Sequence, residues 1–411
     1  MTKIIQKPSI LMIPVFVLFL LFPIYFYYDS LVGLNIIPPI FGGYFTLMSI
    51  ISLLPLFFTY KYLLDNKNIK IRLIDIIFFL IILLTTLISL INYSTGQPKS
   101  SYYNLFSWSM GGILFNLICY FLAKTLPIQS KKLKTIAIIS LTLMILIVLY
   151  NIGDLGIFYL KDQSKNSEFV ASYQGFARSM VVIGLLIVST IKSKKITIPI
   201  FLLTLMALFF NGARTEFILF FFSYILLLFY TSINSRKKFT LTIVILALVT
   251  IIISVGFNNL IENLPDNRMM ELLDIKSSNS GQERIGTTSV AIDTIINKPT
   301  FGDYGSYANN NNIGNYSHNL LSAWVNLGIT GFALYVFAIL IIIVGIFSRF
   351  SKNVSKNPIE RVTFIFSVFT IMALILSKDY SYMLFGFMVG FFSRFEETIN
   401  QKSVKETTTN E

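Results

Sequence analysis

The stretch LIDIIFFLIILLTTLISLIN, Leu73–Asn92, carries a single charged residue, Asp75, in twenty positions. About 20 consecutive apolar residues form a helix that crosses the roughly 30 Å hydrocarbon core of a membrane, so this stretch predicts a transmembrane helix. The rest of the chain has the same character, with 55% hydrophobic residues, 13% charged residues and a mean hydropathy of +0.71. The sequence therefore predicts an all-α, polytopic integral membrane protein and excludes a soluble domain.

Twelve windows of the chain are long and apolar enough to be spans. They define a membrane part at 1–257, an extracytoplasmic loop at 258–317, a second membrane part at 318–394 and a disordered cytoplasmic tail at 395–411. The predicted spans are 9–28, 35–58, 73–92, 105–126, 135–158, 177–191, 196–211, 215–231, 239–257, 318–347, 361–376 and 380–394.

The basic residues predict the orientation. With the N-terminus inside, 23 of the 33 lysines and arginines face the cytoplasm, as the positive-inside rule requires, so both termini are expected inside. The net charge of +13 then reflects topology and attraction to anionic lipid, and nucleic acid is not an expected partner. The single cysteine, Cys119, excludes an intrachain disulfide and a cysteine-ligated metal, and no metal or cofactor is expected.

The loop at 258–317 is long enough to predict a function. Within it, SGQERIGTTSVAIDTIINKP begins with Ser280 and Glu283 at capping-box spacing, and its isoleucines recur at helical spacing until Pro299. This pattern predicts an amphipathic helix that lies on the membrane surface or covers a cavity. The following TFGDYGSYANNNNIGNY, rich in glycine, asparagine and tyrosine, predicts an irregular loop.

Three arginines stand on the outer side of this topology, against the bias of basic residues toward the cytoplasm. Arg178 opens the sixth span, Arg214 opens the eighth, and Arg284 begins the predicted loop helix. The seventh span is short and FFNGARTEFILF returns directly into the eighth, which holds the Arg214 guanidinium at the membrane boundary. The structural alternatives are contact with lipid phosphate for Arg178 and a solvated first-turn residue for Arg284.

His318 is the only histidine, and it lies at the N-terminus of the tenth span. Spans six, eight and ten run inward, so their N-termini present N–H groups and positive dipole ends at the outer surface, together with Arg178 and Arg214. This pattern favours binding of a phosphate. A positive dipole end also keeps the imidazole neutral and able to accept a proton, although an interfacial histidine hydrogen-bonded to the loop is the structural alternative. Gly328 and Gly331 are expected to be packing residues.

Three segments resemble motifs of one known family. SHNLLSAWVNLGITG, Ser317–Gly331, resembles the His-Asn segment followed by Gly-x-x-Gly of the O-antigen polymerase and O-antigen ligase superfamily of bacterial membrane glycosyltransferases. NGARTEF, Asn211–Phe217, is similar to the short arginine motif of that family, and ERIGTTSVAIDTIINKPTFGDYG, Glu283–Gly305, is similar to its large-loop pattern. The segments follow the order of the family across about half of the chain.

The resemblance implies a fold of the GT-C-like kind and glycan transfer from an undecaprenyl-diphosphate donor at the outer face of the bacterial cytoplasmic membrane, without metal or nucleotide sugar. It implies that Arg214 and Arg284 bind the donor diphosphate and that His318 activates the acceptor hydroxyl. Arg178 matches more loosely as a third diphosphate ligand, and Asn319 is a secondary site residue. The implied partners are undecaprenyl-diphosphate-linked glycans, membrane lipids and a chain-length regulator.

Several functions stay open at this point. A polymerase extends a lipid-linked repeat unit, whereas a ligase transfers glycan to lipid A–core; the eight residues between Asn319 and Gly328, one fewer than the spacing associated with ligases, favour a polymerase. A polysaccharide or lipid transporter also suits twelve spans, but carriers keep ionisable residues at the midplane and show repeated halves. A metal-dependent transferase of the oligosaccharyltransferase type needs outer carboxylate pairs, and the loop after Asp29 is short.

Overall fold

The computed structural model describes residues 8–34, 36–40, 43–66, 69–96, 99–152, 158, 172–232, 279–306, 317–348 and 357–408. Helices form nearly all of the regular structure in these residues, and the expected all-α fold is confirmed. The helices are α1 (Pro8–Phe19), η1 (Leu20–Ile24), α2 (Tyr25–Gly33), α3 (Tyr44–Asp65), α4 (Leu73–Thr95), α5 (Lys99–Thr125), α6 (Lys131–Tyr150), α7 (Ser172–Thr190), α8 (Lys194–Phe210), α9 (Arg214–Ser232), α11 (Asn279–Asn297), α12 (Leu321–Phe347), α13 (Pro358–Leu376) and α14 (Leu384–Thr408).

Eight helical segments of the described residues are long and apolar enough to cross a membrane. A shorter apolar helix, Gln174–Thr190, lies at the predicted sixth span, and α8 and α14 lie at the seventh and twelfth. The predicted ninth span, 239–257, lies outside the described residues, so twelve spans and the inward orientation of both termini stay predictions. The eight segments are Met12–Gly33, Tyr44–Asp65, Leu73–Thr95, Tyr102–Thr125, Lys131–Tyr150, Arg214–Ser232, Leu321–Phe347 and Pro358–Leu376.

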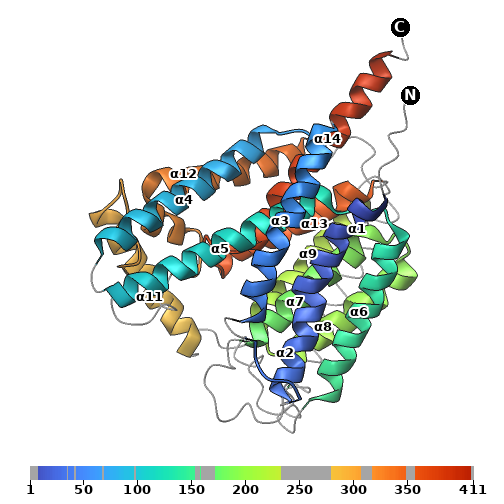
Figure 1. Ribbon diagram of the computed structural model, residues 1–411, viewed down its shortest axis with the longest axis horizontal. Helices are drawn as coiled ribbons and strands as arrows, with labels where there is room; N and C mark the ends of the chain where they lie inside the picture. Colours follow the sequence, from blue (N-terminus) through green and yellow to red (C-terminus); the bar gives the residue numbers. More distant parts are fainter. Residues whose placement is uncertain are drawn as a thin grey trace.

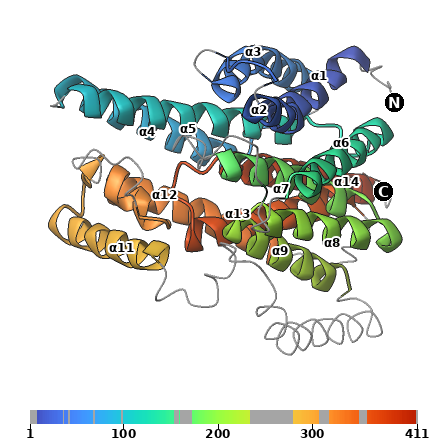
Figure 2. The ribbon, with the colours of Figure 1, turned by 90° about the horizontal axis from the view of Figure 1, so that it is seen from below.

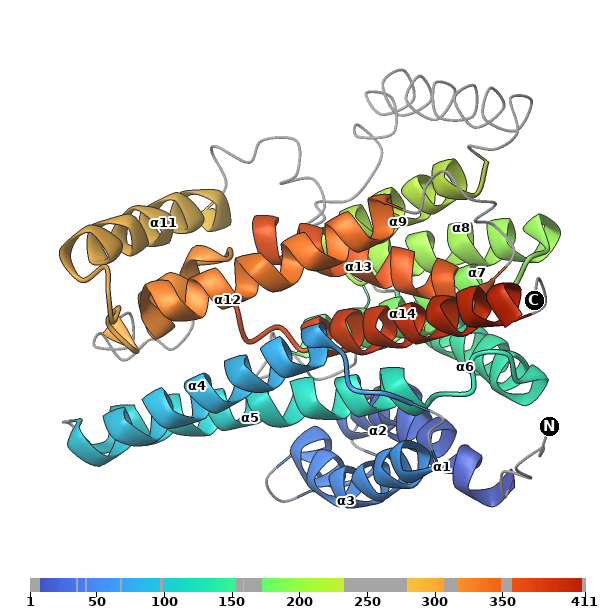
Figure 3. The same ribbon diagram turned by 90° about the horizontal axis from the view of Figure 1, so that it is seen from above.

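The helices form two groups joined by α14. Helices α4, α5 and α12 extend together toward one end of the molecule, where α11 lies beside α12 (Figure 1). Helices α6, α7, α8 and α9 form the second group with α13 (Figure 2). On the opposite side, α1 and α3 pack against α5, and α2 contacts α7. Helix α14 runs between the groups, with α13 along one side and α5 along the other (Figure 3).

Small residues allow α14 to lie directly against α5. A Cβ atom added at Gly386 would meet the backbone of Asn116 and Tyr120, and one added at Gly390 would meet Ala123 and the Tyr120 carbonyl. The side-chain amide of Asn116 completes the contact, because its Oδ1 accepts from the Gly386 N–H at 3.0 Å. Glycines four residues apart permit such close approach, which membrane helices use because lipid gives them no hydrophobic drive to associate.

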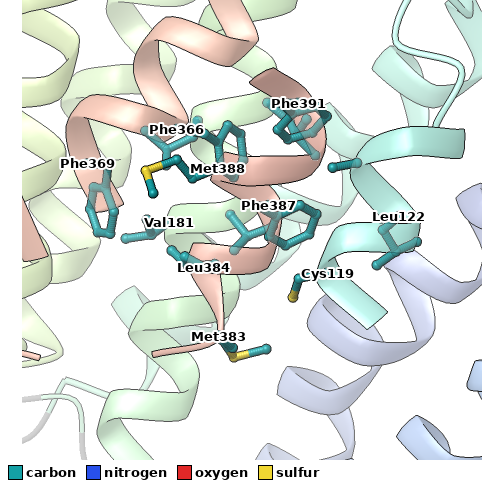
Figure 4. Packing of buried hydrophobic residues seen from close by; sticks show 14 of the residues in the cluster. Cys119, Leu122, Val181, Phe366, Phe369, Met383, Leu384, Phe387, Met388 and Phe391 are labelled. Carbon is teal, nitrogen blue, oxygen red and sulfur yellow. The ribbon is translucent and has the colours of Figure 1, made fainter. Parts of the chain in front are cut away.

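The other face of α14 fills the centre of the bundle with aromatic side chains. Phe387 and Phe391 lie against Phe366 of α13, with ring centroids 5.4 and 5.0 Å from it. Figure 4 shows these rings between Val181 of α7 and the α5 residues around Cys119. Offset and tilted rings at these separations are the favoured arrangement for aromatic pairs, so α14 fixes α5, α7 and α13 relative to one another.

A buried cluster of charged residues joins α14 to α4 and α5 near residue 395, where the predicted tail begins. Lys124 Nζ of α5 lies 2.6 Å from a Glu397 carboxylate oxygen and 3.6 Å from one of Asp75, and it donates to Ser393 Oγ at 2.9 Å. Arg394 donates to the carbonyl of Leu126. Helix α14 continues to Thr408, past the boundary at which the sequence predicts a disordered tail, and these contacts hold it where that tail was expected to begin.

The predicted tenth span is not one straight helix. Helix α12 bends at Gly328, whose φ is +68°, so that Ser322 before the bend and Tyr335 after it both hydrogen-bond the backbone of Tyr380. A Cβ atom at Gly328 would meet the backbone of Thr300 and Phe301. A residue with positive φ and backbone packed against its α-carbon must be glycine, which agrees with the packing role expected for Gly328.

The segment 299–306 holds this bend in place, and we call it the loop clamp. The Trp324 indole donates to the Pro299 carbonyl at 2.8 Å, and the Asp303 N–H donates to the Val325 carbonyl at 2.6 Å. The Tyr304 hydroxyl pairs with Ser109 of α5 at 2.7 Å. The predicted irregular loop is thus irregular in its described part, yet it is hydrogen-bonded to both α12 and α5.

Helix α11 confirms the amphipathic helix expected in the outer loop. Its apolar positions Ile285, Ile292 and Ile296 are exposed, as is Phe301 in the loop clamp, while Ala291 is buried. The isoleucine stripe therefore faces away from the rest of the described protein. This is the surface expected of a helix that lies on a membrane, and its placement there stays a prediction.

Candidate functional site

The candidate site lies where α7, α9 and α12 begin and α13 ends. The turn at 377–383 between α13 and α14, here called the α13–α14 turn, contacts all of the helices that the sequence placed at the outer end. Tyr380 N–H donates to Ser322 Oγ of α12 at 2.9 Å. Lys378 Nζ lies 2.7 Å from Glu216 Oε1 of α9. Arg178 of α7 lies 3.2 Å from the Met383 sulfur.

His318 stands directly before α12 and is half-buried against this turn. Its ring N–H donates a hydrogen bond to the backbone carbonyl of Ser377. Asn319 fixes the backbone around it, because Asn319 Oδ1 accepts from Ser317 Oγ at 2.8 Å and from the Leu321 N–H at 3.0 Å. The Asn319 side chain therefore hydrogen-bonds residues on both sides of His318, just before α12 begins.

The surroundings of His318 disfavour its charged form. Burial is the largest cause, and the charges of Arg284 and Lys378 add to it, whereas the hydrogen bond to Ser377 opposes them. Together they lower the pKa of His318 from 6.5 to about 4. The imidazole is thus neutral at pH 7, as its place at a helix N-terminus led us to expect, and its unprotonated nitrogen has the lone pair that a general base needs.

Arg284 and Lys378 are the two cations that act on His318. Arg284 lies in the first half of α11 and is exposed, and its charge acts on the imidazole. Lys378 is half-buried and forms its ion pair with Glu216, which is nearly fully buried. One of the two cations is therefore exposed to solvent, and the other is paired with a carboxylate.

Arg214 is the first residue of α9 and follows a tight turn. Gly212 has a φ of +72°, and its carbonyl accepts from the Arg214 N–H at 3.1 Å. The Arg214 side chain is half-buried and lies two residues before Glu216, whose carboxylate joins α9 to the α13–α14 turn. The tight return between the seventh and eighth spans, expected from the sequence, is confirmed by this geometry.

Arg178 reaches the same turn from α7. It is half-buried, and besides its contact with Met383 its charge acts on Tyr382. Arg178 therefore lies at the Met383 end of the α13–α14 turn, whereas His318 lies at the Ser377 end. The structure brings all three predicted arginines and the histidine to one end of the bundle, and it links Arg284 most directly to His318.

The sequence interpretation missed the α13–α14 turn itself. Asp379 is buried, which raises the pKa of its carboxyl, and Ser381 donates to its Oδ2 from the backbone at 3.1 Å and from the hydroxyl at 2.6 Å. The signal was present in the sequence, because Lys378 and Asp379 are two charges within a three-residue connection between predicted spans. Charges in so short a connection are held at the membrane boundary, as was argued for Arg214.

Asn211 is a second residue that the sequence interpretation did not single out. It ends α8, three residues before Arg214, and its side chain is only 2% exposed. Neither its amide nitrogen nor its amide oxygen has a hydrogen-bond partner within the described residues. A buried amide without partners costs free energy, which makes Asn211, three residues before Arg214 in the chain, a further candidate site residue.

The arrangement as a whole resembles an anion site with a base at its edge. Guanidinium and ammonium groups come from α7, α9, α11 and the α13–α14 turn, and the N-termini of α7, α9 and α12 add partial positive charge. A phosphate or diphosphate would be stabilised by both. The neutral imidazole supplies the one proton acceptor at neutral pH that such a site needs for attack by a hydroxyl group.

Part of the chain is similar to a known protein family. Residues 199–336 match the family model described as O-antigen ligase. The match runs from α8 into α12 and includes Arg214, Arg284 and His318, whereas Arg178 and the α13–α14 turn lie outside it. No curated protein matches the chain. This match, over about a third of the chain, supports the resemblance of residues 199–336 to the superfamily of O-antigen ligases and O-antigen polymerases.

Proposed function

We propose that this multi-pass membrane protein is a glycosyltransferase that polymerises polysaccharide repeat units carried on undecaprenyl diphosphate, at the outer face of the bacterial cytoplasmic membrane. The observation that carries the proposal is the setting of His318. Its pKa is lowered to about 4, and two cations, Arg284 and Lys378, act on it. A neutral base beside cations is what transfer from a diphosphate to a hydroxyl requires.

The proposed step needs no further reactant. The acceptor hydroxyl of one lipid-linked repeat unit gives its proton to His318, and its oxygen forms a bond to the anomeric carbon of the donor glycan. The bond from that carbon to the diphosphate oxygen breaks, and undecaprenyl diphosphate leaves with the electron pair. Arg214 and Arg284 bind the leaving diphosphate, with Arg178 as a third ligand, and neutralise the charge that develops on it.

The location of the site suits a lipid-linked donor. The candidate residues lie at the ends of apolar helices, and the outward faces of α3, α4 and α12 carry exposed leucine, isoleucine and phenylalanine side chains. A polyprenyl chain would stay among such side chains while its diphosphate reaches the helix N-termini.

A ligase is the second candidate, because the matched family model carries that description. The donor and the chemistry would be the same, and the acceptor would be lipid A–core. The spacing of eight residues between Asn319 and Gly328 is our reason for placing the polymerase first.

The profile of surface polysaccharide in a deletion strain distinguishes the two functions. Loss of a polymerase leaves single repeat units on the final acceptor, whereas loss of a ligase leaves none there and long chains on the carrier lipid. Complementation with His318→Ala should give the deletion profile at normal protein levels in the membrane. Normal chain length in the His318→Ala strain would reject the role of His318 as base.

Arg214→Lys tests the role assigned to the guanidinium. An ammonium group keeps the charge but cannot form two parallel hydrogen bonds to a diphosphate, so polymer should be reduced by about tenfold or more. Lys195→Arg, at the opposite end of the bundle, is the control and should leave the polymer unchanged. Full activity of Arg214→Lys would mean that Arg214 only anchors the start of α9 at the membrane interface and does not bind the diphosphate.

A further inference from the structure

A second cationic cavity lies at the opposite end of the bundle from His318. It has a volume of about 270 Å³ and opens between the end of α7, the start of α8, the end of α9 and the start of α13. These four helices are neighbours in the second group (Figure 2). The charged and hydroxyl side chains that line it include Lys192, Lys194, Thr197, Tyr224, Ser232 and Arg361.

Arg361 is the reason to expect a ligand there. The residue is only 6% exposed, and it lies in the first turn of α13. Its Nη2 donates to the Thr190 carbonyl at 3.3 Å, and its Nε has no partner within the described residues. A buried guanidinium is retained where a counter-charge compensates for its lost hydration, and a neutral carbonyl supplies none.

The groups around Arg361 increase the positive potential instead of cancelling it. Lys192 and Lys194 line the cavity with it, and the charges of Arg361 and Lys192 also act on Lys134 of α6. Among the described residues, no carboxylate lines the cavity. The adjacent Glu360 accepts a hydrogen bond from the Tyr230 hydroxyl at 2.7 Å. The N-termini of α8 and α13 add partial positive charge at the same place.

We propose that this cavity binds a phosphate group, either in the headgroup of an anionic phospholipid or in a small soluble phosphate. Its volume is slightly below the roughly 300–1,000 Å³ of pockets that hold drug-sized molecules, so it suits a headgroup rather than a large ligand. Arg361 would form the charge-assisted hydrogen bond from the cavity floor, and Lys192 and Lys194 would close over the phosphate from the rim. The apolar wall of Val188, Leu227 and Leu228 suits the first carbons of an acyl chain. The inference is independent of the glycosyl-transfer proposal, because it concerns different residues at the other end of the helices.

The test measures binding by the purified full-length chain in a neutral detergent. Native mass spectrometry compares binding of added phosphatidylglycerol with binding of added phosphatidylcholine. Calorimetric titration with sodium phosphate tests whether the cavity binds a small soluble phosphate instead. We expect retention of phosphatidylglycerol over phosphatidylcholine. Lys194→Gln should weaken that binding about fivefold, the effect expected for one lysine near a phosphate surface. Arg361→Gln should weaken binding of phosphatidylglycerol about tenfold or more, because it removes the buried charge and its charge-assisted hydrogen bond to the phosphate.

Lys195→Gln is the matched control, because Lys195 is an exposed neighbour of Lys194 that does not line the cavity. If Arg361→Gln does not fold, the double variant Lys192→Gln/Lys194→Gln decides the question, since both lysines are exposed. Binding of sodium phosphate but not phosphatidylglycerol, with the same dependence on Lys194, would support the site and show that its ligand is a small soluble phosphate. Equal effects of Lys194→Gln and Lys195→Gln, or binding of neither probe, would overturn the proposal.

Discussion

At the scale of single residues, the chemistry of the site is carried by one imidazole and the two cations that act on it. One imidazole lies beside a turn with one ammonium group, and one exposed guanidinium approaches it from α11. Because no second histidine exists in the chain, any signal of an imidazole reports on His318 alone. This makes its protonation state directly measurable in the intact protein.

The pKa of His318 is the first prediction at this scale. Nuclear magnetic resonance of ring-labelled protein in detergent should show one imidazole that titrates at about pH 4. Arg284→Gln removes one of the two repelling cations, so the pKa should rise toward 6.5 without reaching it, because burial, the largest cause, remains. Glu283→Gln, next to it on α11, serves as control. A wild-type imidazole that titrates near 6.5 would contradict the buried, cation-flanked setting.

The ion pair between Glu216 and Lys378 gives the second prediction. Their side chains are 5% and 15% exposed, and this pair joins α9 to the α13–α14 turn. A double-mutant cycle with Glu216→Gln and Lys378→Met should give a coupling free energy of about 0.5–3 kcal/mol in detergent unfolding. The exposed pair Lys298–Asp303, at 2.8 Å, should give about 0.2–1 kcal/mol. Equal coupling in both pairs would mean that the buried pair does not hold the turn.

How much of the site the sequence predicts depends on the kind of signal each residue carries. His318 and Arg214 stand out locally, one by its uniqueness and the other by its tight turn. Lys378 and Asn211 do not, because their importance comes from what folding brings beside them, namely Glu216 and the buried end of α8. A single sequence records which residues are unusual, but it does not record which helix ends converge.

At the scale of elements, the bend in α12 and the loop clamp form one structure. The sequence predicted a span at 318–347 because this stretch is long and mostly apolar, and such a pattern does not show that the helix bends at one glycine. The bend needs the positive φ of Gly328 and the backbone of the loop clamp against its α-carbon. The loop clamp in turn needs Gly302, which has a φ of +68° and faces the carbonyls of Trp324 and Val325.

Glycine substitutions in α12 and α11 give the third prediction. Gly328→Ala should lower the free energy of unfolding by at least about 1–2 kcal/mol from the strained φ alone, and the contact with Thr300 and Phe301 adds to this. Gly286→Ala in α11 should raise it by up to about 1 kcal/mol, because a Cβ there meets nothing within 4 Å and alanine favours a helix. Thermal unfolding in detergent measures both, and opposite signs are expected. Equal effects would show that the loop clamp does not depend on Gly328.

At the scale of the whole molecule, the order of the helices was predictable and their packing was not. Each predicted span within the described residues overlaps a helix, although the bounds of the two differ, because apolar length indicates where a chain can cross a membrane. The central place of α14 was not predictable, since it comes from Gly386 and Gly390 against α5 and from Lys124 beside Glu397. These pairs are more than 200 residues apart in the chain, and their pairing has no local signal in the sequence.

The orientation of the molecule is the last prediction, and the chain is suited to its measurement. The native Cys119 is buried inside α5, so a membrane-impermeant maleimide should not react with it in intact cells. Asp303→Cys, in the loop clamp, should react with the reagent from outside, because its side chain is 39% exposed and the positive-inside rule places this end outward. Lys195→Cys, exposed at the far end of the same bundle, should react only after the membrane is permeabilised. The reverse pattern would turn His318 and its arginines toward the cytosol, where the donor glycan is not presented, and the proposed glycan transfer would then fail with the topology.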